Sequence, residues 1–267
     1  MADKQWKYLT VNQEGRVLTV HFDTQNKVNS LNRALMRELT ALAYQLQDDS
    51  ELNAIILTGQ PSIFSGGMDL KDPELRETQK LTMAQRRKHN QLGPKMCAAW
   101  EALEPVTIAA IESWCIGGAV ALAVACDWRV ASDNVQMYVP ELKLGMNMSW
   151  QSVPRFVNLV GPAKTKQLLL LAQPLSATDA EAWGLVDYLV ATGEALNKAT
   201  ELANKLSAMP PIPLRMAKHA INVSANALND ATSHMDADQF LLTQETEDAR
   251  EGVTAFFEKR PAKFEGN

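Results

Sequence analysis

Two short stretches of the chain share one design: FSGGMD at residues 64–69 and WCIGGA at residues 114–119. Each follows an apolar run typical of a buried strand, at 54–59 in the first case and at 106–111 in the second. Each run leads through a loop to a glycine pair, and helical sequence follows the second pair. Repeated units of strand, loop and helix predict an α/β fold with a mainly parallel sheet.

The glycine pairs also suit a site at which negative charge develops. Glycine lets the backbone approach a ligand closely, and the first turn of a helix leaves amide N–H groups without partners. Two such amides that face one another form an oxyanion hole, which stabilises the enolate oxygen of a thioester that has lost an α-proton. One such donor contributes roughly 3–4 kcal/mol. Either glycine pair alone is more typical of a tight turn, so only the two together indicate a site.

The surrounding sequence shows regular periodicities. Alternating runs at 6–11 and 17–22 predict a β-hairpin, and leucines spaced along 32–46 predict an amphipathic helix. Residues 76–103 are typical of a long helical region that is broken near 93–94. Further along, the periodicity predicts a short strand at 185–190 and helices at 149–171, 178–184, 193–208, 213–228 and 232–258.

Composition and charge disfavour several classes of protein. The 267 residues include 26 Lys and Arg and 31 Asp and Glu, so the net charge is −5. That charge disfavours nucleic acid and anionic membranes as partners. The start, MADKQWKYLT, contains no apolar leader, and the longest apolar run, 116–126, is too short to span a bilayer. Three cysteines without a CxxC pair suit a reducing compartment, so we expect a cytoplasmic protein without a membrane anchor.

Several catalytic motifs are missing from the sequence. It contains no GxGxxG after a strand, no Walker-type phosphate loop, no GxSxG and no HExxH, and its four histidines are far apart. These absences disfavour dinucleotide, nucleotide, serine-hydrolase and zinc-protease chemistry. We therefore predict no metal site and no permanently bound cofactor.

The glycine stretches belong to a longer series of motifs that resembles the crotonase family of enoyl-CoA hydratases and isomerases. The matching segments, in the family's order and spacing, are AIILTG (54–59), FSGGMDLK (64–71), TIAAI (107–111), CIGGA (115–119), ACD (125–127) and PELKLG (140–145). The tail from FFEKRP at 256–261 to Phe264 also resembles the C-terminus of that family. The likeness covers nearly the whole chain.

The resemblance implies a fold, a substrate and an assembly. Residues 1–195 would form a crotonase-like ββα spiral core that binds an acyl-CoA thioester. Residues 196–267 would form a helical C-terminal region for packing and oligomerisation, in trimers that often pair into hexamers. Coenzyme A enters only as part of the substrate, while the acyl chain, the pathway and the choice between trimer and hexamer stay open.

By motif position, the resemblance places the thioester oxygen between the backbone amides of Met68 and Gly118, which follow Gly67 and Gly117. Similar enzymes carry up to two glutamates beside this hole. One glutamate position falls three residues after the second glycine, on the same helix face. The residue at this position is Ala121.

The other glutamate position follows the proline of the PELKLG segment and is occupied by Glu141. Hydration of a 2-enoyl thioester in this family uses two carboxylates to hold and deprotonate water, and Ala121 supplies only a methyl group. A 1,3-proton shift needs one base. We therefore predict an enoyl-CoA isomerase with Glu141 as its base. A hydratase, an acyl-CoA thioester hydrolase, or a non-catalytic CoA-binding or RNA-interacting protein are the alternatives.

The segment after residue 145 departs from the Pro- and Gly-rich turn of related hydratases, which leaves the acyl group undefined. The other residues that we expect to contact the acyl-CoA are Trp114, Asn147, Trp150, Gln151 and Phe264, with Lys71 and Asn29 on the coenzyme A side. A basic cluster at 85–89 could meet CoA phosphates or RNA, but a solvated helix face is the favoured interpretation.

Overall fold

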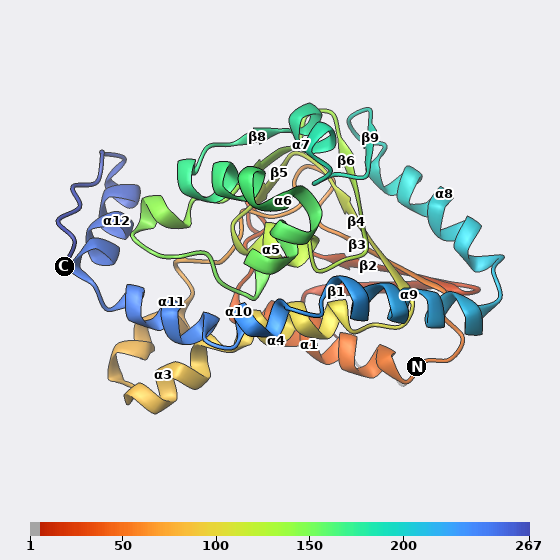
Figure 1. Ribbon diagram of the computed structural model, residues 1–267, viewed down its shortest axis with the longest axis horizontal. Helices are drawn as coiled ribbons and strands as arrows, with labels where there is room; N and C mark the ends of the chain where they lie inside the picture. The colour runs from red at the N-terminus through yellow and green to blue at the C-terminus, as the bar shows by residue number, and fades with distance from the viewer. Residues whose placement is uncertain (1–5) are drawn as a thin grey trace.

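A six-stranded sheet forms the centre of the protein (Figure 1). The computed structural model describes residues 6–267, apart from the side chains at positions 76 and 79. Residues 1–5, which belong to the start that the sequence analysis expected to carry no leader, lie outside the described residues. In sheet order, the strands are β1 (Leu9–Glu14), β2 (Val17–Phe22), β3 (Ala54–Thr58), β4 (Val106–Ile111), β6 (Trp128–Ser132) and β9 (Tyr188–Val190). The β1–β2 pair is antiparallel and all other neighbours are parallel, which confirms the predicted hairpin and mainly parallel sheet.

A second sheet of short strands joins the loops at one end of the first. It contains β5 (Trp114–Ile116), β7 (Gln136–Tyr138) and β8 (Leu175–Ser176), in that order. None of these strands exceeds three residues, and sequence periodicity is not measurable over so short a run. The sequence analysis therefore did not predict this sheet.

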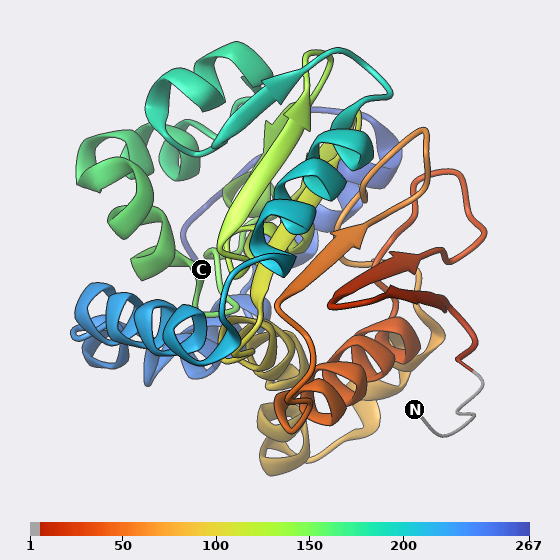
Figure 2. The same ribbon diagram turned by 90° about the vertical axis from the view of Figure 1, so that its right-hand side faces the viewer.

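Helices cover both faces of the six-stranded sheet because its central strands are apolar on both sides. Ile55 and Leu57 of β3 pack in the same core as helices α1 (Arg33–Gln47) and α4 (Leu92–Glu101). The alternate residues of β3 pack with helix α8 (Ala195–Ser207), which crosses the opposite face (Figure 2). The boundary predicted at residue 195 thus falls at the first residue of α8 and would separate that helix from the sheet that it covers.

The other helical segments surround these layers. They are α2 (Pro73–Glu77), η1 (Thr78–Lys80), α3 (Met83–Asn90), α5 (Gly118–Ala123), η2 (Glu141–Leu144), α6 (Ser152–Leu171), α7 (Ala177–Trp183), α9 (Pro211–Ala225), α10 (Asn229–Ser233), α11 (Asp236–Gln244) and α12 (Glu247–Glu258). The predicted break at 93–94 lies earlier, at Gln91, because Pro94 stands in the first turn of α4, where a missing N–H costs no hydrogen bond. The single helix predicted at 232–258 is three helices.

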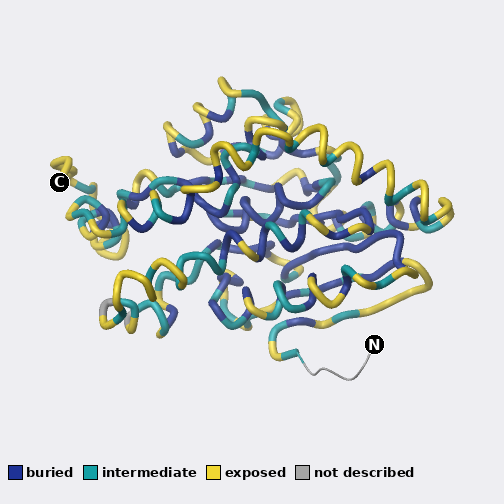
Figure 3. Tube along the Cα trace, turned by 60° about the horizontal axis from the view of Figure 1, so that its bottom comes forward, coloured by how far each residue is buried: buried dark blue, intermediate teal, exposed yellow. Residues whose placement is uncertain are grey.

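Burial is concentrated in the strands and in the segments around α5, whereas the C-terminal segment is largely exposed (Figure 3). The chain's C-terminal end, with α11 and α12, lies at the opposite end of the molecule from the hairpin turn and α9 (Figure 1). Within residues 6–267, no helix is both long enough and apolar enough to cross a membrane.

Candidate active site

The two glycine stretches run side by side because their loops are joined by backbone hydrogen bonds. The amide of Phe64 donates to the carbonyl of Glu112 at 2.8 Å, and that of Ser65 donates to Trp114 at 3.1 Å. In return, the amide of Ile116 donates to Ser65 at 3.0 Å. This ladder brings the first glycine pair next to the second, as the sequence predicted.

The contact between the stretches is tight enough to require glycine. Gly67 has a φ of +80°, and a Cβ there would lie 2.3 Å from the carbonyl oxygen of Ile116 and 3.5 Å from the amide nitrogen of Gly118. Gly117 has a φ of 53° and a ψ of −116°, a conformation that side chains exclude. Both positions therefore hold the backbone in a shape that no other residue reaches without strain.

The amides that follow these glycines are free to bind a ligand. The amide of Gly67 donates to the Ser65 hydroxyl at 3.1 Å, and that of Gly117 donates to the carbonyl of Tyr138 at 2.7 Å. The amides of Met68 and Gly118, in contrast, donate to no residue within the described range 6–267. Two unpaired N–H groups at adjacent points of one cavity wall match the predicted oxyanion hole.

Glu141 lies at the same point. A Cβ at Gly117 would be only 2.6 Å from its Oε1 atom, and its Oε2 atom is buried without a hydrogen-bond partner among the described residues. Burial raises the pKa of Glu141 from its ordinary value of 4.5 to about 7. A carboxyl group with this pKa can both take and return a proton near neutral pH.

The C-terminal helix fixes the position of Glu141. The short helix η2, which begins at Glu141, ends at Gly145 in the left-handed conformation. A Cβ at Gly145 would lie 2.4 Å from the carbonyl oxygen of Asp248 in α12, and one at Gly252 would lie 2.5 Å from the carbonyl carbon of Leu144. Two glycines thus let α12 and η2 pack backbone against backbone.

These groups face one cavity of about 600 Å³. Of the predicted site residues, it is lined by Gly67, Met68, Lys71, Gly117, Gly118, Glu141, Trp150 and Phe264. Lining residues that the sequence analysis missed include Lys143, Phe257 and Arg260. The FFEKRP block at 256–261 was the available signal for the last two, and the basic residue within PELKLG was the signal for Lys143. The cavity is mostly apolar, with cations at Lys71, Lys143 and Arg260.

The side chain of Asn29 has a structural role and does not line the cavity, so the structure does not support its predicted contact with coenzyme A. Its side chain is fully buried, and its Nδ2 donates to the carbonyls of Phe22 and Phe64 at 3.1 and 2.9 Å. Its Oδ1 accepts from the amide of Thr24 at 3.0 Å. The side chain of Asn29 joins the end of β2 to the first glycine stretch, and its donors and its acceptor oxygen are occupied within the chain.

Four other predicted contacts also lie outside the cavity. Trp114 is 38% exposed on β5, and Ala121 is buried inside α5 behind the cavity wall. Asn147 accepts a hydrogen bond from the Thr243 hydroxyl at 2.9 Å and lines a separate cavity. Gln151 is a structural residue whose amide donates to Asp236. None of these four side chains lines the cavity that holds Met68 and Gly118, so the structure does not support their predicted contacts with a ligand bound there.

Two arginines of the basic cluster at 85–89 form ion pairs within the chain. Arg86 pairs with Glu245 and Arg87 pairs with Asp238, at 2.5 and 2.6 Å, so that α3 is joined to α11. No group of three or more His, Cys, Asp or Glu side chains in the described part of the chain is arranged to hold a metal ion.

The raised pKa of Glu141 predicts a pH-dependent stability. The folded state binds the proton more tightly than the unfolded chain, so this stabilisation is complete below pH 4.5 and is lost as the pH rises through about 7. Replacement by glutamine removes the titration. Between these pH values, we expect the unfolding free energy of Glu141→Gln relative to wild type to increase by on the order of 2–3 kcal/mol in urea titrations. A difference independent of pH would show that the carboxyl is well solvated.

The chain is similar to known proteins over its whole length. The model of the enoyl-CoA hydratase/isomerase family matches residues 12–267. A short-chain-enoyl-CoA hydratase of Clostridium acetobutylicum is 33% identical over 95% of each chain, and a crotonyl-CoA hydratase of Syntrophomonas wolfei is 30% identical over 97% of this chain and 98% of that protein.

The solved structures agree with the sequence relatives. The crystal structure of an enoyl-CoA hydratase from Mycobacterium avium subsp. paratuberculosis has a TM-score of 0.87, covering 98% of this chain and 100% of that chain, at 22% identity. That likeness shows the shared fold and confirms the predicted crotonase-like architecture. With a matching family model and relatives at 30% identity or more, the chain belongs to the enoyl-CoA hydratase/isomerase family.

Proposed function

We propose that this protein moves the double bond of an enoyl-CoA thioester, with Glu141 as its single acid–base group. The observation that carries the proposal is the buried, unpaired carboxylate oxygen of Glu141 beside the free amides of Met68 and Gly118. The other acidic residue that lines the cavity, Asp69, accepts from the amide of Lys71 at 2.9 Å and so has a structural role. Of these two lining carboxylates, Glu141 is the one with a buried oxygen that has no hydrogen-bond partner among the described residues.

The reaction follows from these groups. The two amides hold the thioester oxygen, and the Glu141 carboxylate removes a proton from C2 of a 3-enoyl-CoA. The electron pair passes into a dienolate whose negative charge rests on the oxygen between the amides. Glu141, now protonated, returns the proton to C4, which leaves the double bond between C2 and C3. The step needs no redox cofactor, because no electrons leave the substrate.

The rest of the cavity suits the coenzyme A portion. Lys71 and Lys143 supply positive charge for phosphates, and Phe257 and Phe264 are 45% and 48% exposed at the same cavity. Arg260 also lines the cavity, but its guanidinium is paired with Glu251 and Glu258.

A second candidate function is hydration, because the similar proteins of Clostridium and Syntrophomonas are named hydratases. Glu141 also lines a second cavity of about 490 Å³, together with Asn147, Ser233 and Gln239, which could supply water. A thioester hydrolase would use the same water. Turnover of 3-enoyl, 2-enoyl and saturated acyl-CoA by the purified protein separates the three activities. We expect the 3-enoyl substrate to give the highest kcat/KM, and preference for either other substrate would refute the isomerase proposal.

The pH profile of this activity follows from the pKa of Glu141. A general base acts in its ionised form, and burial raises the pKa of this carboxyl to about 7. We expect kcat/KM for the 3-enoyl substrate to fall about tenfold per pH unit below pH 7 and to level off above it. Stopped-flow or steady-state rates from pH 5 to 9 measure this profile. A flat profile would assign the base to a group with an ordinary carboxyl pKa.

We also propose that the protein assembles as a trimer or hexamer in the cytoplasm. The supporting feature is a row of exposed apolar side chains on α9, where Ile212, Met216 and Val223 are 70%, 67% and 59% exposed. All three cysteines are free thiols, which suits a reducing compartment. Sedimentation equilibrium tests the assembly, and a monomer at micromolar concentration would contradict it.

A further inference from the structure

The indole of Trp150 is wedged between two glycines at the wall of the active-site cavity. A Cβ at Gly118 would lie 2.5 Å from its Cη2 atom, and a Cβ at Gly93 in α4 would lie 2.1 Å from its Cε2 atom. The residue is only 7% exposed and lines the cavity. The ring therefore fills the space directly beside one amide of the oxyanion hole.

An uncommon backbone conformation directs this side chain. Trp150 and Gln151 both have positive φ, 62° and 56°, which bulky residues rarely adopt. Nη1 of Arg155 donates to both of their carbonyl oxygens, at 3.0 and 2.9 Å. Asp236 accepts from the amide of Gln151 at 3.1 Å. Backbone strain of this kind persists only where several surrounding contacts hold the backbone in place.

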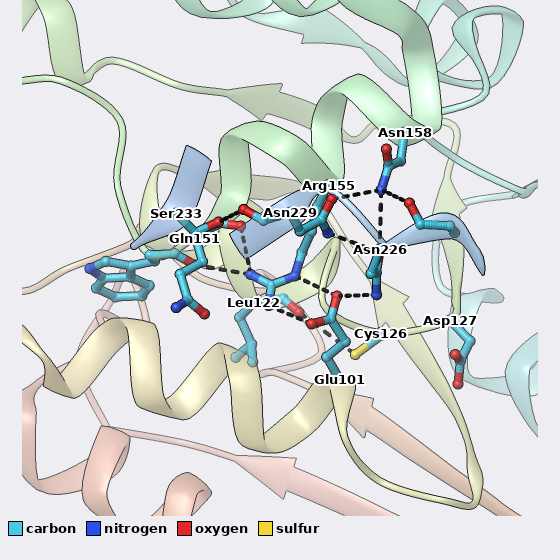
Figure 4. Close-up of polar contacts among 12 residues, drawn as sticks. Glu101, Leu122, Cys126, Asp127, Gln151, Arg155, Asn158, Asn226, Asn229 and Ser233 are labelled. Carbon is cyan, nitrogen blue, oxygen red and sulfur yellow. Dashed lines mark hydrogen bonds and ion pairs between the residues drawn. The ribbon is translucent and has the colours of Figure 1, made fainter. Parts of the chain in front are cut away.

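Arg155 is itself fixed by the neighbouring helices. Its Nε and Nη2 atoms each donate to a carboxylate oxygen of Glu101 in α4 at 2.8 Å, and Glu101 also accepts from Asn226 at the end of α9 (Figure 4). The Arg155 side chain is 5% exposed. Three helices, α4, α6 and α9, thus brace the turn that carries Trp150.

The space that the Trp150 indole fills also explains why residue 121 has a small side chain. Ala121 lies three residues after Gly118 in α5, and side chains on a helix lean toward its N-terminus. A longer side chain at position 121 would extend over Gly118, where the indole already lies. The methyl group of Ala121 and the ring of Trp150 therefore form a sterically linked pair.

We propose that Trp150 determines the reaction outcome, because its indole excludes both a second carboxylate and the water that such a group would hold. This inference rests on the proposed function and deepens it. Hydration adds the hydroxyl group of water to C3 and a hydrogen to C2, whereas isomerisation only moves a hydrogen from C2 to C4. With the space beside Gly118 filled, the proton on Glu141 returns to carbon. Trp150 is a specificity-determining residue, and Arg155 and Glu101 are positioning residues.

The first experiment measures 2-enoyl-CoA hydration and 3-enoyl-CoA isomerisation by each variant. Trp150→Ala opens the space to water, and we expect the ratio of hydration to isomerisation to rise about tenfold or more. Trp183→Ala is the matched control, since that tryptophan lies in α7 and lines neither cavity; its ratio should equal that of wild type. An unchanged ratio in Trp150→Ala would overturn the inference.

The second experiment measures thermal stability and does not depend on enzymatic activity. We expect Ala121→Glu to lower Tm by about 5–10 °C in the wild-type background, because the new side chain meets the indole, and by less than half as much in Trp150→Ala. Equal losses in both backgrounds would show that the two positions are independent and would contradict the steric pairing. The double variant should also give the highest hydration ratio.

The two proposals fail in different ways. A wild-type protein that does not turn over 3-enoyl-CoA refutes the isomerase function, whereas the Tm comparison still tests the steric pair. A wild-type isomerase whose hydration ratio does not respond to Trp150→Ala refutes only the role of Trp150.

Discussion

Replacement of Glu141 by glutamine is expected to lower kcat for 3-enoyl-CoA isomerisation by about 10³-fold or more, with KM changed little. The amide has the shape of the carboxylate but accepts no proton, and general acid–base catalysis contributes about 10²–10⁴-fold. A single group that both removes and returns the proton loses both steps at once. Oε2 of Glu141 is buried without a hydrogen-bond partner among the described residues, so the replacement of that oxygen breaks no hydrogen bond.

The control for this variant is Glu181→Gln, which changes an exposed carboxylate in α7 outside the cavity. Its rate should lie within about twofold of wild type. Steady-state formation of the conjugated 2-enoyl product measures both variants. Turnover of Glu141→Gln at more than about a tenth of the wild-type rate would mean that another group is the base.

The second large effect is expected for Gly67→Ala. The new Cβ would lie 2.3 Å from the Ile116 carbonyl oxygen, at a φ of +80° that disfavours alanine. Because the obstacle is backbone, the loop must move and carry the Met68 amide with it. Loss of one oxyanion donor costs about 10²–10³-fold in kcat. We expect a loss of this size in steady-state assays.

The variant Gly193→Ala distinguishes the effect of backbone strain at a positive φ from the effect of a steric clash with the new Cβ. Gly193 has a similar φ of +88°, but a Cβ there meets nothing within 4 Å, and the residue lies outside the cavity. This control should lose some thermal stability while keeping its kcat. Equal kcat losses in the two variants would show that Gly67 acts through general destabilisation and not through the amide of Met68.

The sequence predicted the parts of the site that depend on local backbone chemistry. Buried strands are visible as apolar runs, and a glycine pair after each run indicates a close approach of the backbone. The placement of both glycine pairs at one site came from the resemblance to a family. The position of Glu141 came from the resemblance to a family. Its burial and its pKa of about 7 depend on contacts between distant segments and were not visible in the sequence.

The errors arose where long-range contacts decide the role of a residue. Asn29 has the residue type of a ligand-binding group, but Phe22 and Phe64 occupy its donors. Asn147 is turned toward α11 by Thr243. The packing of α12 on η2 depends on Gly145 and Gly252, more than a hundred residues apart, and no local periodicity records that contact.

The most direct test of the central claim is a crystal structure of Glu141→Gln with 3-enoyl-CoA bound. The account predicts a thioester oxygen within about 3 Å of both the Met68 and the Gly118 amide nitrogens, with the side chain at position 141 against the substrate carbons C2 to C4. A thioester oxygen bound elsewhere, or a position 141 side chain turned away from those carbons, would contradict it.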